Sequence, residues 1–83
     1  MAVAYTRHAR DALDKRKIRE EWVERAIHKP DRVEPDRIDP VLEHRLLAIA
    51  EREGRVLRVV VNPSVSPELV ITAYFDRGMK GQL

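Results

Sequence analysis

The spacing of apolar residues changes near residue 44, from a helical period to the alternation of β-strands. In the first part of the chain, Ala9, Ala12 and Leu13 lie three and four positions apart, behind a threonine at position 6. Thr6 is a residue type that caps helix N-termini, because its hydroxyl accepts a hydrogen bond from a free backbone N–H. This pattern predicts a helix over residues 7–16.

A second helix is predicted over residues 20–28. Its buried face would consist of Trp22, Val23, Ala26 and Ile27. Two glutamates in its first turn match the positive end of the helix dipole, and Pro30 ends it. Two of the five prolines fall in residues 31–42, which predicts a short edge strand over 32–34 and then a loop.

From residue 44 the pattern predicts strands joined by turns. Residues 44–52 and 55–61 form a hairpin around Glu53 and Gly54, because glycine adopts the positive φ that a tight turn needs. A loop at 62–67 leads to a strand at 69–75, and residues 78–83 are expected to be a loose tail. The fold class is therefore α+β, with two N-terminal helices packed on a curved antiparallel sheet of three or four strands.

The hairpin register decides which side chains share a face. A two-residue turn places Arg52 opposite Arg55, so that Leu57, Val59 and Val61 face the helices together with the alternate residues Leu46, Ala48 and Ala50. In the last strand the helix side would take Leu69, Ile71, Ala73 and Phe75. The outer face then carries four chemically active side chains, Arg45, Glu51, Arg58 and Tyr74. Apolar residues are mixed among them, so we expect a partner, the C-terminal tail or a ligand to cover this face.

Length and composition narrow the class of protein. Eighty-three residues are enough for one domain, spanning 1–83. Cysteine is absent, and no apolar run approaches a membrane span, so a cytoplasmic protein without membrane contact is expected. The net charge is only +2, but twelve of the sixteen basic residues are arginine, whose planar fork suits phosphate.

The outer face has side chains that metal-free RNA cleavage would use. That reaction needs a base for the 2′-hydroxyl, a cation on the phosphate and a proton donor to the leaving oxygen. Glu51, Arg58 and either Tyr74 or His8 are the candidates for these roles. The alternative is structural, with a cross-strand Glu–Arg ion pair and a tyrosine packed over its neighbours. The three histidines lack metal-ligand spacing and no glycine-rich phosphate loop is present, so neither metal nor cofactor is expected.

Four segments together resemble one small bacterial family of unknown function, whose opening motif is T-x-H-A-x-x-R. They are the segments 5–10, 21–23, 54–61 and 70–77, and the resemblance covers about residues 5–81. Where family members usually carry a Gly-Ile-Ser or Gly-Ile-Thr cap before the second helix, this chain has Lys17-Ile18-Arg19. We therefore expect that helix to lack an N-cap side chain.

That family in turn distantly resembles the RelE/ParE and BrnT toxins of type II toxin–antitoxin systems. The resemblance implies a metal-independent endoribonuclease that acts on RNA at the ribosome and is neutralised by an antitoxin protein. It implies catalytic roles for His8, Arg58 and Tyr74, and RNA binding by Arg10 and Arg77, while Arg45 joins them from the sheet face. The alternative is a non-catalytic module that binds protein or nucleic acid on a degenerate toxin fold. The sequence leaves the oligomeric state open.

Overall fold

Both helices have the predicted bounds. The structure is a computed structural model that describes residues 3–83. Helix α1 spans Arg7–Arg16 and helix α2 spans Glu20–His28. The Thr6 hydroxyl oxygen accepts a hydrogen bond from the backbone N–H of Ala9 at 3.0 Å and donates to the carbonyl of Ile71 at 3.1 Å, so the cap also ties α1 to the sheet. No side chain caps α2, as the sequence predicts.

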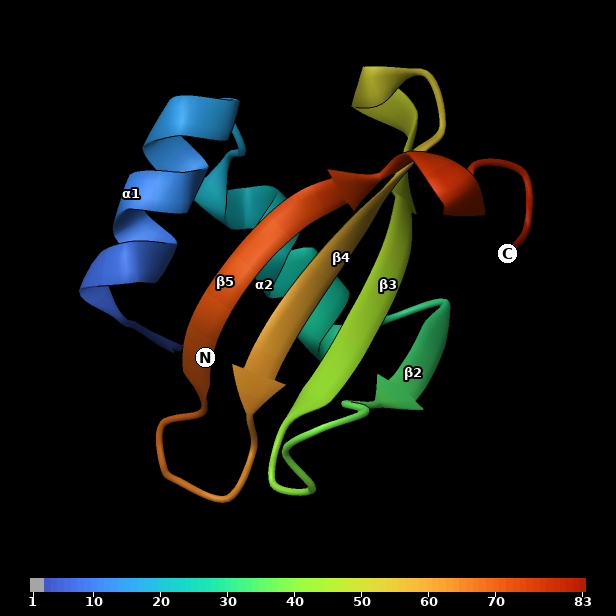
Figure 1. Cartoon of the computed structure of the whole chain (residues 1–83). Coiled ribbons are helices and arrows are strands. Elements are labelled where there is room, and N and C mark those ends of the chain that lie inside the picture. The colour runs from blue at the N-terminus through green and yellow to red at the C-terminus, as the bar shows by residue number, and fades with distance from the viewer. Residues whose placement is uncertain (1–2) are drawn as a thin grey trace.

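Within residues 3–83 the sheet has five strands, in the order β1-β5-β4-β3-β2 (Figure 1). Their bounds are Ala4–Tyr5 for β1, Arg32–Pro35 for β2, Glu43–Ile49 for β3, Arg55–Asn62 for β4 and Leu69–Asp76 for β5. The α+β class is confirmed. The predicted sheet was antiparallel with three or four strands. The observed sheet differs, because it has five strands and is mixed, with β1 pairing in parallel with β5.

The hairpin register differs from the prediction by an odd number of residues. Strand β3 ends at Ile49, and a 3₁₀ turn, η1 (Ala50–Arg52), precedes Glu53 and Gly54, which both have positive φ. Leu47 therefore pairs with Leu57, and Arg55 pairs with Ile49 instead of Arg52. An odd shift exchanges the two faces of β3, so Leu47 and Ile49 join the core. The inward positions of Leu57, Val59 and Val61 are confirmed.

A bulge exchanges the predicted faces of β5 at the start of the strand only. The register between β4 and β5 shifts between Val60 and Val61. Ala73 and Phe75 face the helices as predicted, but on the other side of the bulge Val70, predicted to point outward, lies in the core. Tyr74 stays on the outer face, as predicted, where it pairs directly with Arg58.

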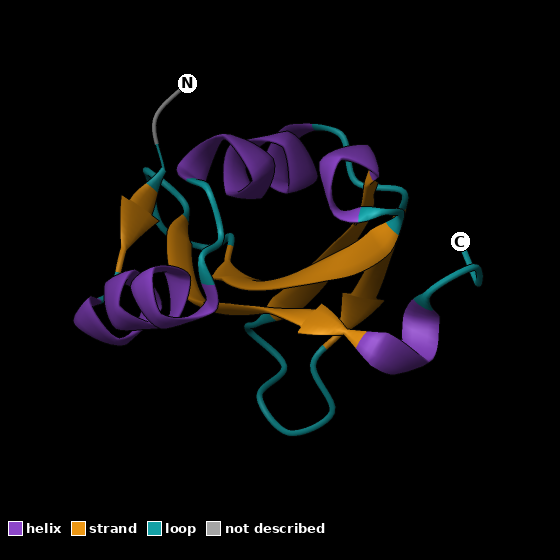
Figure 2. Cartoon of the chain, turned by 90° about the horizontal axis from the view of Figure 1, so that it is seen from above, coloured by secondary structure: helices purple, strands orange, loops and turns teal. Residues whose placement is uncertain are grey.

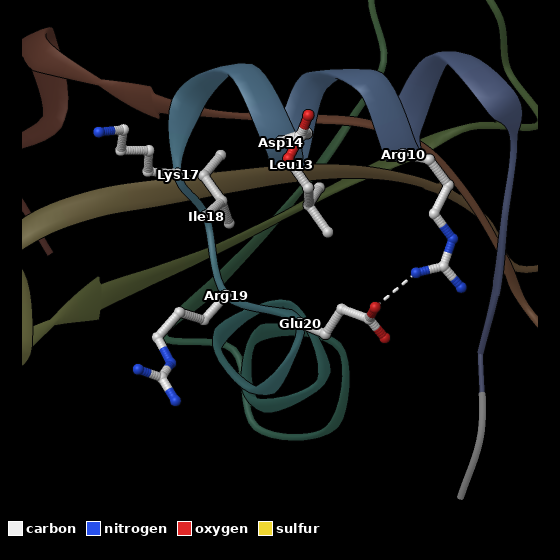
Figure 3. A pocket seen from close by; sticks show the side chains of 7 residues that line it. All are labelled: Arg10, Leu13, Asp14, Lys17, Ile18, Arg19 and Glu20. Carbon is white, nitrogen blue, oxygen red and sulfur yellow. Dashed lines mark hydrogen bonds and ion pairs between the residues drawn. The ribbon is translucent and has the colours of Figure 1, made fainter.

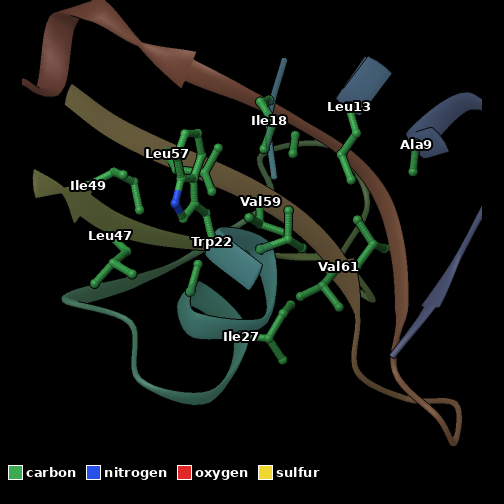
Figure 4. Packing of buried hydrophobic residues seen from close by; sticks show 14 residues of the cluster. Ala9, Leu13, Ile18, Trp22, Ile27, Leu47, Ile49, Leu57, Val59 and Val61 are labelled. Atoms are coloured by element: carbon green, nitrogen blue, oxygen red, sulfur yellow. The ribbon is translucent and has the colours of Figure 1, made fainter. Parts of the chain in front are cut away.

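The core lies between the helices and one face of the sheet (Figure 4). Helix α1 packs on β5, whereas α2 packs on β3 and β4. Trp22 contributes the largest side chain, and its ring meets Phe75 edge-on with the centroids 6.2 Å apart. Burial of this cluster is the main force that holds the helices on the sheet.

The opposite face of the sheet is partly covered by the chain itself. Leu46, Val56 and Val60 point away from the helices but are buried. A C-terminal 3₁₀ turn, η2 (Arg77–Met79), packs against β4, and Figure 2 shows it on the other side of the sheet from α2. The C-terminal tail therefore supplies part of the expected cover, and the prediction that 78–83 is wholly loose is wrong at its start.

Candidate functional site

The structure brings together two of the four predicted catalytic side chains. Arg58 and Tyr74 are cross-strand neighbours on the outer face. Glu51 lies in η1, where both carboxylate oxygens accept hydrogen bonds from Arg25 of α2 at 3.1 and 3.2 Å. This pairing lowers the pKa of Glu51 and places it on the helix side. The predicted grouping is wrong for Glu51, because β3 ends two residues before it. His8 is exposed in the first turn of α1, away from Arg58.

The predicted RNA-binding arginines are also separated. Arg10 pairs with Glu20, and its guanidinium lies 4.2 Å from the centre of the Tyr5 ring. Arg45 faces the helix side, where it donates to Glu43, to both oxygens of Glu68 and to the carbonyl of Ile27. Its predicted place on the outer face is wrong, because of the odd register shift. Arg77 alone of the three lies in an open, arginine-rich hollow.

We call this feature the arginine hollow. It is an open hollow of about 280 Å³ at the end of the molecule drawn uppermost in Figure 1, lined by Arg16, Arg52, Arg55, Arg77, Tyr74 and Phe75. Each arginine comes from a different element: the last turn of α1, η1, the start of β4 and η2. The fold therefore gathers at one place four cations from three separate parts of the sequence, the end of α1, the turn between β3 and β4, and the C-terminal η2.

None of these four arginines forms an ion pair with a carboxylate of residues 3–83. Arg16 donates to the carbonyl of Ala73 at 3.2 Å. The guanidinium carbons of Arg52 and Arg55 lie 4.9 and 4.6 Å from the centre of the Phe75 ring. These contacts hold the side chains in place without neutralising them, so the hollow is suited to attract an anion.

Three of the four arginines that line the arginine hollow were not among the predicted site residues. Arg52 and Arg55 flank the predicted turn, so their proximity was available from the hairpin alone. Arg16 reaches the same place only because α1 packs along β5, which is a tertiary contact with no local signal.

Beside the hollow, a second polar group surrounds Arg58. We call it the histidine–arginine cluster, and its members are Glu34, Asp36, His44, Arg58 and Asp76. Arg58 donates from Nε to Asp76 at 2.9 Å and from Nη1 to Glu34 at 3.1 Å and to His44 Nδ1 at 2.8 Å. His44 Nε2 lies 2.6 Å from Asp36 Oδ1. Tyr74 connects the two places, because it lines the hollow and pairs with Arg58.

The charges of the histidine–arginine cluster are stabilised by hydrogen bonds. The backbone N–H of Asp39, then the His44 side chain and the N–H of Ile38, lower the pKa of Asp36 to about 2. Burial lowers the pKa of Arg58, but its hydrogen bonds to Glu34 and Asp76 outweigh burial and the net shift is upward. The bond from Arg58 likewise lowers the pKa of Glu34. At neutral pH the carboxylates of Asp36 and Glu34 are therefore both ionised.

A larger hollow of about 650 Å³ lies between the two helices (Figure 3). Its lining mixes both charges, and Arg10 and Glu20 pair across it. Its cations are therefore partly neutralised, which makes it a poorer anion site than the arginine hollow.

Two features that residues 3–83 lack bear on the class of site. No group of three or more histidine, cysteine, aspartate or glutamate side chains within this range is placed to hold a metal ion. Among the described helices, none has the length and apolar character needed to cross a membrane.

Comparison with known proteins identifies a family. Neither a curated protein nor a solved structure matches the chain. One family model, described as "Domain of unknown function (DUF4258)", matches residues 5–75, which include most of both sites described above. The chain therefore belongs to the DUF4258 family.

Proposed function

We propose that this chain is a cytoplasmic, toxin-like domain that binds single-stranded RNA at the arginine hollow. The observation that carries the proposal is the set of four arginines around Tyr74 and Phe75 that have no carboxylate partner within residues 3–83. Guanidinium groups bind phosphate through paired N–H donors, and aromatic rings stack on unpaired bases. An open hollow of about 280 Å³ suits a nucleotide of a flexible strand better than a rigid duplex.

Binding can be measured by fluorescence anisotropy with a labelled ten-nucleotide RNA. Arg16→Ala and Arg77→Ala should each weaken binding by about tenfold, or about 1.4 kcal/mol, because each removes one phosphate ligand. Arg7→Ala is the matched control, since Arg7 is exposed at the other end of α1 from Arg16. Equal affinities for all four proteins would place RNA elsewhere or exclude it.

A second proposal is that the bound RNA is cleaved without a metal ion, as by the toxins that the sequence resembles. Its support is the direct pairing of Arg58 with Tyr74 beside the arginine hollow, which places a cation and a phenol next to the expected path of the strand. The test is incubation of RNA with the protein in EDTA, followed by gel analysis of the products. Binding without cleavage would favour the non-catalytic module instead.

The toxin-like proposal also includes a neutralising antitoxin protein. The arginine hollow supports this, because an acidic segment could cover the same four cations that would hold RNA. Induced expression of the chain alone should arrest growth, and co-expression of an antitoxin encoded by a neighbouring gene should relieve the arrest. Growth unaffected by the chain alone would count against a toxin.

A further inference from the structure

His44 is held by hydrogen bonds at both ring nitrogens. Arg58 carries only donors, so His44 Nδ1, 2.8 Å from Arg58 Nη1, must present a lone pair. The proton of the neutral ring is then on Nε2, which donates to Asp36 Oδ1 at 2.6 Å. A carboxylate that fixes the tautomer of a histidine, with the opposite nitrogen left basic, is the arrangement that enzymes use for a general base.

We propose that His44 is the general base for RNA cleavage and that Asp36 positions it. This inference rests on the proposed metal-independent cleavage. It corrects the assignment of the base to Glu51, whose carboxylate is held by Arg25 on the helix side. The base and the phosphate-binding cation are here hydrogen-bonded to each other, so one substrate group can meet both.

The chemical step begins when a phosphate oxygen accepts the Arg58 N–H that His44 Nδ1 accepts in the free protein. The freed lone pair takes the proton of the ribose 2′-hydroxyl, and the 2′-oxygen attacks phosphorus. The bond from phosphorus to the 5′-oxygen breaks, and that oxygen takes a proton from the Tyr74 hydroxyl. The products are a 2′,3′-cyclic phosphate and a 5′-hydroxyl, and the protonated His44 ring returns its proton to the Tyr74 oxygen through solvent.

The surroundings of His44 fit this role. Asp36 faces it from the turn after β2, Glu34 is its neighbour on β2 and Arg58 reaches it from β4, so two carboxylates balance the positive charge that the ring gains. The side chains of His44, Arg58 and Asp36 are 16%, 12% and 22% exposed, so the cluster is ordered yet open to the outer face. Arg58 Nη2 has no hydrogen-bond partner among residues 3–83, which leaves donors for the phosphate.

The experiment compares RNA cleavage in EDTA by the parent, His44→Ala, Asp36→Asn and the control His28→Ala. His28 is an exposed histidine at the end of α2. His44→Ala should lose at least about a hundredfold in rate, the lower end of what a general base contributes. Added imidazole should restore part of that rate, because it occupies the vacated space as a free base. Asp36→Asn should lower the maximal rate and move the acidic limb of the pH–rate profile to lower pH, because the charge that stabilises the protonated ring is gone.

Two kinds of failure are distinguishable. If the parent does not cleave RNA, the cleavage proposal fails and this inference fails with it. If the parent cleaves and His44→Ala cleaves equally fast, only the role of His44 is overturned. RNA binding and thermal melting of each variant are measured alongside. A slow His44→Ala variant that melts as the parent does but gains nothing from imidazole would also overturn the role.

Discussion

At the scale of single residues, ion pairing separates the twelve arginines into two kinds. Arg45 and Arg58 are largely buried and paired with carboxylates, which hold their side chains in place. Of these two, Arg58 still has an Nη2 group without a hydrogen-bond partner among residues 3–83. Arg16 and Arg77 have no carboxylate partner within residues 3–83 and remain available to a ligand. The residue type alone does not distinguish the paired arginines from the unpaired ones. Their partners come from contacts between distant segments, which explains why the sequence placed Arg45 on the wrong face and gave no sign that Arg16 and Arg77 line one hollow.

Tyr5 gives a prediction about stability. Its hydroxyl is buried without a hydrogen-bond partner among residues 3–83, while Arg10 stacks on its ring. Tyr5→Phe keeps the ring and removes the unsatisfied polar atom. We expect the free energy of unfolding to rise by about 1 kcal/mol, the lower end of the cost of such a group. Urea denaturation measures this. A less stable variant would mean that the hydroxyl has a partner after all.

The same hydroxyl gives a prediction about pH. Burial, followed by the charges of Glu20 and Glu24, raises the pKa of Tyr5 from 10.0 to about 12. The folded state thus favours the neutral phenol, so this contribution to stability is complete below pH 10 and is lost as the pH rises to about 12. Ultraviolet titration of the parent against Tyr5→Phe should show one tyrosine that ionises near pH 12. A difference spectrum that titrates near pH 10 would contradict the burial.

At the scale of elements, local signals predicted the helices and tertiary contacts decided the strand register. The bounds of α1 and α2 follow from spacing and from Thr6 and Pro30, which act within a few residues. The hairpin could close with a two-residue turn or with η1, and the turn residues Glu53 and Gly54 suit both. Burial decides, because the observed register places Leu47 and Ile49 in the core, whereas the predicted one buried Ala48 and Ala50 there. Comparing those side-chain sizes would have favoured the observed register.

Strand β1 had no detectable signal in the sequence. It comprises only Ala4–Tyr5, and it is a strand because these two residues pair in parallel with β5. Backbone bonds from Ala4 to Glu68 and from Thr6 to Val70 fix it there. Two residues are too few for a period to be recognised, so the mixed sheet was beyond sequence analysis.

The uncapped start of α2 gives a prediction at this scale. Arg19 occupies the N-cap position and makes no capping hydrogen bond. Arg19→Asp supplies an acceptor for the free N–H groups and a negative charge at the positive end of the dipole. It should raise the free energy of unfolding by about 1 kcal/mol relative to Arg19→Ala. The exposed ion pair between Arg19 and Glu21 is lost in both variants and should matter little. Equal melting of the two would contradict the capping argument.

At the scale of the whole molecule, the fold concentrates uncompensated charge at one end of a nearly neutral chain. The net charge is +2, yet four arginines without carboxylate partners in residues 3–83 surround a single hollow. Acidic residues elsewhere pair with other arginines, as Glu68 does with Arg45 and Glu51 with Arg25. Low net charge therefore does not argue against a phosphate ligand, because the local field at the hollow is what a polyanion meets.

The salt dependence of RNA binding tests the central claim most directly. If each of the four arginines contacts one phosphate, a plot of log Kobs against log salt for a single-stranded RNA should have a slope of about −3. The double variant Arg16→Ala/Arg77→Ala should reduce the magnitude of that slope by about 1.4, and Arg7→Ala should leave it unchanged. A slope that is the same in all three proteins, or binding that does not respond to salt, would contradict the account.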